Sequence, residues 1–360
     1  MGTGNAKVDP DKLKQTAERV FGYLGGAMIS ATVYLGERMG LYRALDSAGS
    51  VTSEELARKT GLHERWIREW LMGQAAAELV SYKGDGRFAL TPEAAMVLAQ
   101  EDSPMFLAGG FCALPQQMAV LERLPQAFKT GIGLSYDALG SEVNRSVERL
   151  LAPWFRTQLV PVALPALDGV VDKLNSGAKI ADVGCGAGVA VIEMAKAYPK
   201  SLFHGYDIAK IPLSAAADNA KRAGVRNVEW HDAKIDGLPA DSSFDFITTF
   251  DCLHDMTRPD LVMSAIRGAI KADGTWLIAD IHGQASFEQN LTDNPLAALM
   301  YGFSVMFCMS SAMSEPGGLG LGTLGFPEPV ARKMTTEAGF TRFVTRDFEN
   351  PINAYYEVRP

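Results

Sequence analysis

Between Lys179 and Val191 the chain reads K-I-A-D-V-G-C-G-A-G-V-A-V, an apolar run that carries one acid, Asp182. Three glycines follow the acid at every second position: Gly184, Gly186 and Gly188. A helical pattern begins directly after them. Glycines have no Cβ to collide with a ligand, and the free N–H groups in the first turn of a helix point toward it. The stretch predicts a strand, a tight turn and a helix N-terminus that bind a nucleotide-like ligand through the backbone.

Acidic residues end the next predicted strands in the same way. Asp207 lies 25 residues after Asp182, and Asp232 lies 25 residues after Asp207. Asp251 ends the strand that follows. An acid at the end of the second strand suits the two hydroxyls of a ribose, and an acid after the third suits an exocyclic adenine amine. Aspartate is common after strands, so each acid alone is a weak signal and the set of four carries the inference.

The glycine spacing and Asp182 together indicate which ligand the turn holds. A dinucleotide-binding turn has a third glycine, or an alanine, where this chain has Val189. A pyrophosphate is also disfavoured by a carboxylate two residues before the first glycine. Asp182 suits an ammonium group, although it also suits a role in ordering the turn. The pattern favours adenosine with a cationic amino-acid tail over a nicotinamide dinucleotide.

His254, in the segment C-L-H-D-M just past the fourth predicted strand, is the candidate catalytic residue. A histidine with a pKa near neutrality suits a general base that takes a proton from an acceptor oxygen. The alternative is that His254 only packs or orders its loop, and that Asp255 caps the following helix. Glu288 and Glu315 are the weak candidates for an acid that orients His254. Of the other histidines, His204 and His231 lie in strands and are interpreted as structural, and His282 is a lesser site candidate.

The second half of the chain alternates strands and helices. Repeated β-α units with apolar, β-branched strands are typical of a parallel sheet covered on both faces, with ligands beyond the carboxyl ends of the strands. The predicted strands are 179–184, 202–207, 228–231, 244–250 and 274–281, and the predicted helices are 189–198, 213–223 and 259–271. The four acids therefore belong to one edge of one sheet. A helix around 154–171 is expected to pass close to that edge.

The first half is predicted to be mainly helical. Helices at 54–59 and 63–79, followed by short strands at 80–83 and 87–90 around the turn Gly84-Asp85-Gly86, form a winged helix-turn-helix. Residues 50–90 carry six basic and six acidic side chains, so dimerisation or a lid role is favoured over DNA binding. Before this motif, residues 11–45 have helical spacing with an expected break or kink at Gly22, Gly25 and Gly26. The expected domains are 1–100, a helical linker at 101–174, and 175–360.

Composition sets further limits. The chain has 360 residues, 47% hydrophobic and 21% charged, with a net charge of −8 that argues against general nucleic-acid binding. Its four cysteines are far apart, which is typical of reduced thiols in a cytosolic protein and predicts neither disulfides nor a zinc site. The sequence shows no signal peptide, and its apolar N-terminal run is too short and too rich in small residues for a membrane span. A cytoplasmic protein without a membrane partner is expected.

Taken together, these motifs resemble the class I S-adenosylmethionine-dependent methyltransferases. I-A-D-V-G-C-G-A-G is similar to their first motif, G-Y-D-I to their ribose-binding acid, H-D-A to their adenine-contacting step and F-D-F-I-T-T-F-D to their fourth strand. With its first half, the chain resembles bacterial two-domain methyltransferases with a winged-helix N-terminal domain, and more distantly the plant-type O-methyltransferases. The resemblance implies a Rossmann-like, mostly parallel α/β sheet of seven strands, the last antiparallel at 354–358. It also implies S-adenosylmethionine as cofactor, bound by Asp182, Gly184, Cys185, Gly186, Gly188, Asp207, Ile208, Asp232, Ala233, Phe250 and Asp251.

The acceptor is expected to be a small, partly apolar molecule. Residues 294–326 combine Met306, Met309 and Met313 with a glycine-rich segment, which suits the wall of an apolar pocket with a mobile rim facing the N-terminal domain. Methylation of oxygen is favoured because the plant-type enzymes carry their base in a similar L-H-D segment, here at His254. Three alternatives stay open: N- or S-methylation without a base, a winged-helix transcription regulator that senses the cofactor, and a nicotinamide oxidoreductase. A homodimer through the N-terminal helices is expected.

Overall fold

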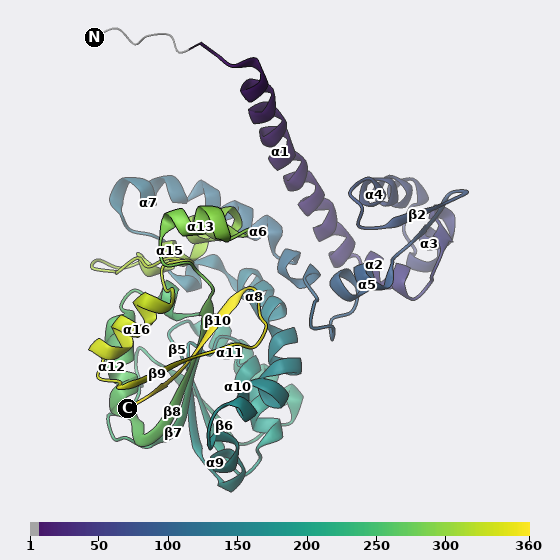
Figure 1. The fold of residues 1–360 in the computed structure, drawn as a ribbon. Helices are drawn as coiled ribbons and strands as arrows, with labels where there is room; N and C mark the ends of the chain where they lie inside the picture. The colour runs from purple at the N-terminus through teal and green to yellow at the C-terminus, as the bar shows by residue number, and fades with distance from the viewer. Residues whose placement is uncertain (1–6) are drawn as a thin grey trace. The chain divides into compact units, whose positions relative to one another are not determined.

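The computed structural model describes residues 7–360, which divide into two compact units (Figure 1). The first unit runs through Leu114 and the second begins at Pro115. The helical segment at 115–174 therefore belongs to the same unit as the large sheet. Within the described residues, none of the helices combines the length and the apolar character needed to cross a bilayer.

The first unit is a winged helix-turn-helix, as predicted. Thr52 caps α3 through a reciprocal capping box with Glu55, and Gly61 ends that helix in the left-handed conformation. Its three strands form an antiparallel sheet in the order β1-β3-β2. The elements are α1 (Pro10–Arg38), α2 (Leu41–Asp46), β1 (Val51–Thr52), α3 (Ser53–Thr60), α4 (Glu64–Ala76), β2 (Ser81–Gly84), β3 (Arg87–Ala89) and α5 (Pro92–Leu98).

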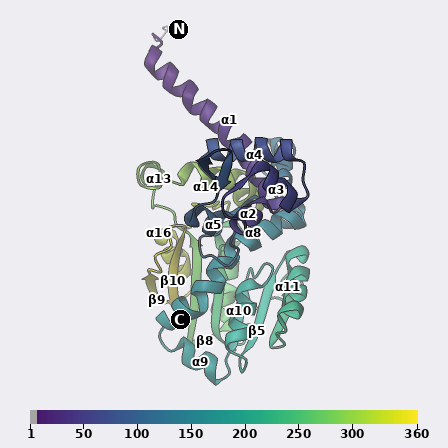
Figure 2. The same cartoon turned by 90° about the vertical axis from the view of Figure 1, so that its right-hand side faces the viewer.

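The first helix does not break where the sequence predicted. Gly22, Gly25 and Gly26 all lie inside α1, and the chain leaves the helix only at Gly40, which has a φ of +69°. A glycine inside a helix costs about 1 kcal/mol relative to alanine and does not by itself end it. The glycine that packing requires is Gly36, where a Cβ would lie 2.5 Å from Cζ2 of Trp70 on α4. Figure 2 shows α1 as one continuous helix.

The second unit contains the expected seven-stranded sheet, with strand order β6-β5-β4-β7-β8-β10-β9. Neighbouring strands from β6 to β8 are parallel, whereas β10 is antiparallel to both β8 and β9. The prediction of a final antiparallel strand is confirmed. The strands are β4 (Lys179–Val183), β5 (Leu202–Asp207), β6 (Val228–Asp232), β7 (Phe244–Phe250), β8 (Ile270–Ile281), β9 (Arg342–Arg346) and β10 (Asn353–Arg359).

Helices cover both faces of this sheet (Figure 1). One buried core joins the sheet to α9 (Val170–Ser176), α10 (Val189–Ala197) and the π-helical segment Phe155–Ala163. The opposite core joins it to α12 (Pro259–Ala269) and α16 (Glu328–Glu337). Two further helices, α8 (Ser141–Trp154) and α11 (Lys210–Ala223), contact α10 and complete the first layer.

Short helices gather at the carboxyl edge of the sheet. The loop after α7 is joined to α15, because Gly133 N–H donates to Met313 O at 2.9 Å and Leu134 N–H donates to Ser310 Oγ at 2.8 Å. Segments distant in sequence therefore meet above the strand ends. These elements are α6 (Leu114–Ala119), α7 (Leu124–Thr130), α13 (Phe287–Asp293), α14 (Ala297–Phe303), the π-helical turn Ser304–Cys308 and α15 (Met309–Ala312).

Candidate active site at the carboxyl edge of the sheet

The three glycines after β4 all have positive φ, at +77° for Gly184, +53° for Gly186 and +75° for Gly188. Two of them are also required by close packing. A Cβ at Gly184 would lie 2.7 Å from Cys252 Sγ, and one at Gly188 would overlap the Trp230 ring. At Gly186, in contrast, no heavy atom of the described chain lies within 4 Å of a Cβ position. The turn thus presents open space at Gly186 while both flanking glycines are packed.

Asp207, at the end of β5, supports this turn directly. Its Oδ2 accepts the Gly186 N–H and its Oδ1 accepts the Ala209 N–H, both at 2.8 Å. Burial raises the pKa of Asp207, while these backbone donors oppose the rise. The neighbouring Ile208 is half exposed. The Asp207 carboxylate therefore lies beside the glycine turn and partly faces the open space at Gly186.

Asp182 is buried inside the end of β4, with 2% of its surface exposed. Thr248 Oγ1 on β7 donates to its Oδ1 at 2.7 Å. Burial raises the pKa of Asp182 to about 7, with a further contribution from the negative charge of Asp207. At neutral pH this group therefore ionises at the cost of a large desolvation penalty, which a nearby cation would relieve.

Asp232 and Ala233 lie beside Asp207 on the next strand. Asp207 and Asp232 are register partners across β5 and β6, and Ala233 N–H donates to Asp207 O at 2.9 Å. Asp232 Oδ1 accepts the Lys234 N–H at 3.1 Å. The structure thus brings the predicted acids of β4, β5 and β6 to one edge.

Phe250 and Asp251 end β7 on the other side of the turn. The Phe250 ring is buried and meets the Phe155 ring edge-on at 5.0 Å. Asp251 has a φ of +49°, unusual for a residue other than glycine, and Asn353 Nδ2 donates to its Oδ1. Burial raises the pKa of Asp251 to about 7, helped by the charge of Asp280.

His254 lies just beyond this strand and is almost completely buried, with 3% exposed. Its Nδ1 is 2.5 Å from Oδ1 of Asp280, a fully buried residue near the end of β8. Burial lowers the pKa of His254, but the Asp280 carboxylate and contact with Cys308 outweigh it and raise the pKa well above its usual value. The acid that contacts His254 is therefore Asp280, and the prediction of Glu288 or Glu315 was wrong.

Asp280 was missed because it lies within an apolar strand. It nevertheless has the signal used for the other acids, an aspartate near the carboxyl end of a parallel strand, in A-D-I-H. Tyr136 was also missed as a site residue. Burial and the charges of Asp255 and Asp207 raise its pKa well above the usual value, which locates its hydroxyl among the site acids. Nothing in its loop sequence indicated this position.

The glycine-rich segment 315–326 lies against the His254 turn. Gly322 N–H donates to His254 O at 3.1 Å, and Leu319 N–H donates to Thr257 O at 2.9 Å. The segment before it contributes Cys308, which contacts His254. His282 is exposed beyond β8, with its N–H donating to Ile352 O at 2.7 Å. Of the predicted histidines, His254 alone contacts a buried acid at the end of β8.

Two family models match the chain. Residues 174–313 match a methyltransferase domain, and residues 27–100 match an Rv2258c-like winged helix-turn-helix domain. Among solved structures, a putative O-methyltransferase from Nostoc punctiforme superposes with a TM-score of 0.72 at 17% identity, over 95% of this chain and 99% of that one. Human N-acetylserotonin methyltransferase in complex with S-adenosylmethionine superposes with a TM-score of 0.69 at 16% identity, over 99% of both chains. At these identities the likeness is one of fold.

Curated relatives match about a third of the chain. A ubiquinone biosynthesis O-methyltransferase from Paracidovorax citrulli is 27% identical over 130 residues, which is 36% of this chain and 53% of the relative. The chain thus spans about half the length of the curated relatives it matches. From these matches and the observed fold, the chain carries a methyltransferase domain at residues 174–313 and an N-terminal winged helix-turn-helix domain at residues 27–100.

Proposed function

We propose that this protein transfers a methyl group from S-adenosylmethionine to an oxygen atom of a small, partly apolar acceptor, with His254 as general base. The observation that carries the proposal is the buried His254–Asp280 pair, 2.5 Å apart, at the sheet edge where the glycine turn lies. A methyl acceptor that is already nucleophilic needs no base, whereas a neutral hydroxyl benefits from one. An oriented imidazole therefore favours an oxygen acceptor over an amine or a thioether.

The residues at the turn fit this cofactor. The open space at Gly186 admits the ligand, and Asp207 beside it suits the ribose hydroxyls. Asp182 would pair with the ammonium group, since a buried carboxylate with a pKa of about 7 gains most from a cation. We assign the adenine end to Asp232 and Ala233, and the remaining contacts to Cys185, Ile208, Phe250 and Asp251.

Two buried polar atoms also favour a ligand here. Within residues 7–360, Asp137 Oδ1 and Trp154 Nε1 have no hydrogen-bond partner. Asp137 lies close enough to Asp207 to raise its pKa, and the Trp154 ring lies 6.2 Å from the Phe250 ring. Buried polar atoms are rarely left unpaired in proteins, so a bound polar molecule would account for both.

Each side chain then has a defined task. S-adenosylmethionine supplies an activated methyl group, so the protein must align the acceptor, exclude water and accept a proton. Asp280 holds His254 through Nδ1, which leaves Nε2 to take the acceptor proton. Since the pKa of His254 is raised, its neutral form requires a higher pH than an ordinary histidine does. The rate is therefore expected to rise as the pH increases.

The acceptor pocket is assigned to the segment around Cys308 and the methionines after it. Cys308 contacts His254, and the glycine-rich segment that follows is hydrogen-bonded to the His254 turn. The Tyr136 hydroxyl lies among the same groups, close to Asp255 and Cys308. The methionine thioethers and the Tyr136 ring, together with His254 as the base, suit a small aromatic or apolar alcohol as the acceptor.

The winged-helix domain is proposed to serve in dimerisation and not in DNA binding. On α4, the would-be recognition helix, Arg65 pairs with Glu69 at 2.5 Å and Arg68 with Glu64 at 3.2 Å. Trp66 on the same helix is 79% exposed. Arginines paired with acids on their own helix offer little net charge to phosphates. The exposed apolar side chains of α1 are the proposed dimer contact, and they include Leu13, Val20, Phe21, Leu24 and Met28.

Calorimetry tests the cofactor first. We expect S-adenosylhomocysteine to bind and NADH not to bind, and the reverse result would overturn the assignment. Transfer of a labelled methyl group to a panel of phenols, amines and thioethers then tests the acceptor class. On the best acceptor, His254→Gln should lower kcat by about 10²- to 10⁴-fold. Asp280→Asn should lower kcat and alter the pH profile.

The exposed His63 provides the matched control, since His63→Asn changes a histidine outside the sheet unit and should leave the rate unchanged. If His254→Gln keeps both cofactor binding and the full rate, His254 is not the base. Preferred turnover of an amine or a thioether would favour the alternative of methyl transfer without a base.

A further inference from the structure

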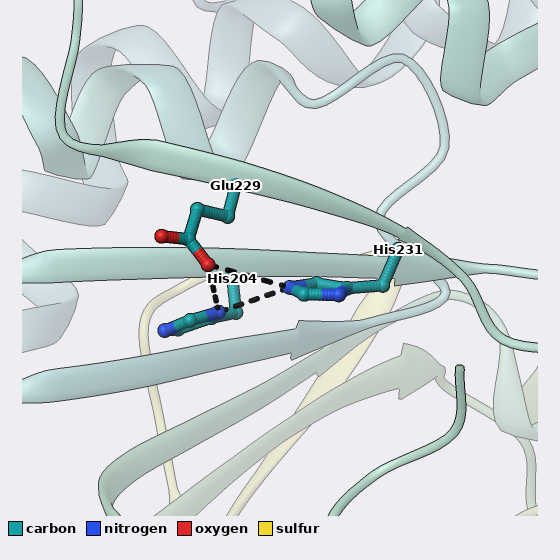
Figure 3. Close-up of side chains that lie close together, drawn as sticks. All are labelled: His204, Glu229 and His231. Carbon is teal, nitrogen blue, oxygen red and sulfur yellow. Dashed lines mark hydrogen bonds and ion pairs between the residues drawn. The ribbon is translucent and has the colours of Figure 1, made fainter.

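His204, Glu229 and His231 are brought together by strand register. On the parallel pair β5–β6, His204 is opposite Glu229 and Tyr206 is opposite His231. Residues two apart on a strand point to the same face, so Glu229 and His231 lie on one side, and the register places His204 beside them. Figure 3 shows the three side chains converging from the two strands. No metal site was expected from the sequence, because the cysteines are far apart, with no C-x-x-C pair and no histidine at ligand spacing.

The ligand atoms of the three residues surround a common point. His204 Nδ1 lies 3.0 Å from His231 Nε2 and 3.4 Å from Glu229 Oε2, and the last pair, His231 Nε2 and Glu229 Oε2, is 4.0 Å apart. Two ligands about 2.05 Å from a tetrahedral metal ion lie about 3.3 Å from each other. The three observed separations bracket that value, so an ion fits with small adjustments of the side chains.

The hydrogen bonds leave one lone pair at this point. Asp236 Oδ2 is 2.6 Å from His231 Nδ1, so Nδ1 carries the proton, and His231 Nε2 accepts from His204 Nδ1 at 3.0 Å when no ion is bound. A bound ion would replace that hydrogen bond, with the His204 proton moving to its own Nε2, a buried atom without a partner among the described residues. A carboxylate behind a histidine ligand in this way fixes its tautomer and increases its basicity. The Glu229 carboxylate contacts both imidazoles of the cluster, and the Asp236 carboxylate contacts that of His231.

Aromatic packing holds both rings in place. The Tyr206 ring stacks on His231 at 4.4 Å, and the Phe244 ring meets His204 edge-on at 5.5 Å. The β5–β6 pairing runs without a register shift from Phe203 to Asp207. Since the Glu229 side chain is 55% exposed, an ion can reach the cluster from solvent. The two histidine rings are therefore held rigidly, and the Glu229 side of the cluster is open to solvent.

We propose that His204, His231 and Glu229 bind a first-row transition-metal dication such as Zn²⁺, with Asp236 positioning His231. Two imidazoles favour Zn²⁺, Ni²⁺ or Cu²⁺ over Mg²⁺ and Ca²⁺, which take oxygen ligands. The ion would link edge strand β6 to β5. The carboxyl ends of these strands carry Asp232 and Asp207, so the metal would stiffen this wall of the sheet edge. The metal site does not depend on the proposed methyl transfer.

The test uses the full-length protein without a histidine tag, stripped with a chelator and titrated with ZnCl₂ in a calorimeter. We expect one equivalent to bind and to raise the melting temperature. His231→Gln should abolish that binding. Asp236→Asn should weaken it about 10- to 100-fold, as expected for loss of an outer-sphere carboxylate. His63→Asn, the control at an exposed histidine, should bind as the wild type does.

A second probe separates a built site from loose association. Co²⁺ in the stripped protein should give visible absorption bands typical of nitrogen and oxygen ligation, and Zn²⁺ should displace them. The proposal is overturned if the wild type binds no more Zn²⁺ than His231→Gln does, or if Mg²⁺ binds equally well. Far-UV circular dichroism of metal-free His231→Gln checks its fold. If this variant is unfolded, Asp236→Asn decides: unchanged Zn²⁺ affinity overturns the site, and weakened affinity supports it.

Discussion

Replacing Asp182 with asparagine should have opposite effects on stability and on cofactor binding. Asp182 is 2% exposed, and burial raises its pKa from 3.8 to about 7. The change Asp182→Asn keeps the shape and retains an oxygen that can accept from Thr248 Oγ1, which donates at 2.7 Å. It removes only the charge. The variant therefore isolates the energetic effect of a buried carboxylate at the glycine turn.

The stability effect follows from proton linkage. The folded state holds the Asp182 proton up to about pH 7, whereas the unfolded chain releases it near pH 4, so the folded protein loses stability as the pH rises between these values. A shift of about three pKa units corresponds to about 4 kcal/mol. Asparagine does not titrate, so the variant escapes this loss. The melting temperature of the variant minus that of the wild type should therefore increase by on the order of 10 °C between pH 4 and pH 8.

Cofactor binding should change in the other direction. If the carboxylate pairs with the ammonium group of the ligand, the variant loses a charge-assisted hydrogen bond worth about 1.5–3 kcal/mol. Affinity for S-adenosylhomocysteine at pH 8 should fall by roughly ten- to a hundred-fold, measured by calorimetry. Asp218→Asn, the same substitution on the exposed surface of α11, is the matched control and should change neither quantity.

Two results would refute this reasoning. If Asp182→Asn and the wild type differ in melting temperature by the same amount at pH 4 and pH 8, the carboxylate does not ionise at a cost in the folded state. If the variant binds S-adenosylhomocysteine as tightly as the wild type at pH 8, Asp182 orders the turn and does not contact the ammonium group.

Two further predictions concern the glycine turn and the dimer. Gly188→Ala should lower the free energy of unfolding more than Gly224→Ala does. Both glycines have φ near +75°, and an alanine in that conformation costs about 1–2 kcal/mol. Only at Gly188 would the added Cβ also overlap the Trp230 ring, which costs about 1–3 kcal/mol more. Equal losses in urea unfolding would contradict the packing argument. Phe21→Asp, at a 73% exposed position on α1, should convert a dimer into a monomer in light scattering, whereas Gln15→Asp on the same helix should not. A wild type that is monomeric at every concentration would rule out the dimer.

The sheet was predictable because its signals are local. Apolar, β-branched runs separated by helical spacing define the strands, and the glycines after Val183 mark the turn, so strands β4 to β8 lie within a few residues of their predicted positions. The N-terminal helix was less predictable. Three glycines indicated a break, yet the structure has one helix, because each glycine weakens the helix by only about 1 kcal/mol.

The contacts of His254 could not be predicted from the sequence, for a different reason. Asp280 lies 26 residues from His254, and it is the pairing of β7 with β8 that brings the two strand ends together. Tyr136 is more distant still, and enters the site through the loop after α7 that is hydrogen-bonded to α15. The His204, Glu229 and His231 cluster depends likewise on the register of β5 against β6. Strand register and long-range loop contacts are set by the whole fold, so local patterns could not supply them.

The charges at the sheet edge strengthen the original argument about the ligand. Burial raises the pKa of Asp182, Asp251 and Asp255 to about 7 in each case, and it also raises the pKa of Asp207. Since Asp182, Asp251 and Asp255 ionise near pH 7, the negative charge at this edge increases as the pH passes 7. A pyrophosphate would add negative charge to this site, whereas S-adenosylmethionine, with a sulfonium, an ammonium and a carboxylate group, brings a net charge of +1. The electrostatics therefore argue against a dinucleotide independently of the glycine spacing, and they predict that binding of the cationic cofactor at pH 6–7 releases protons.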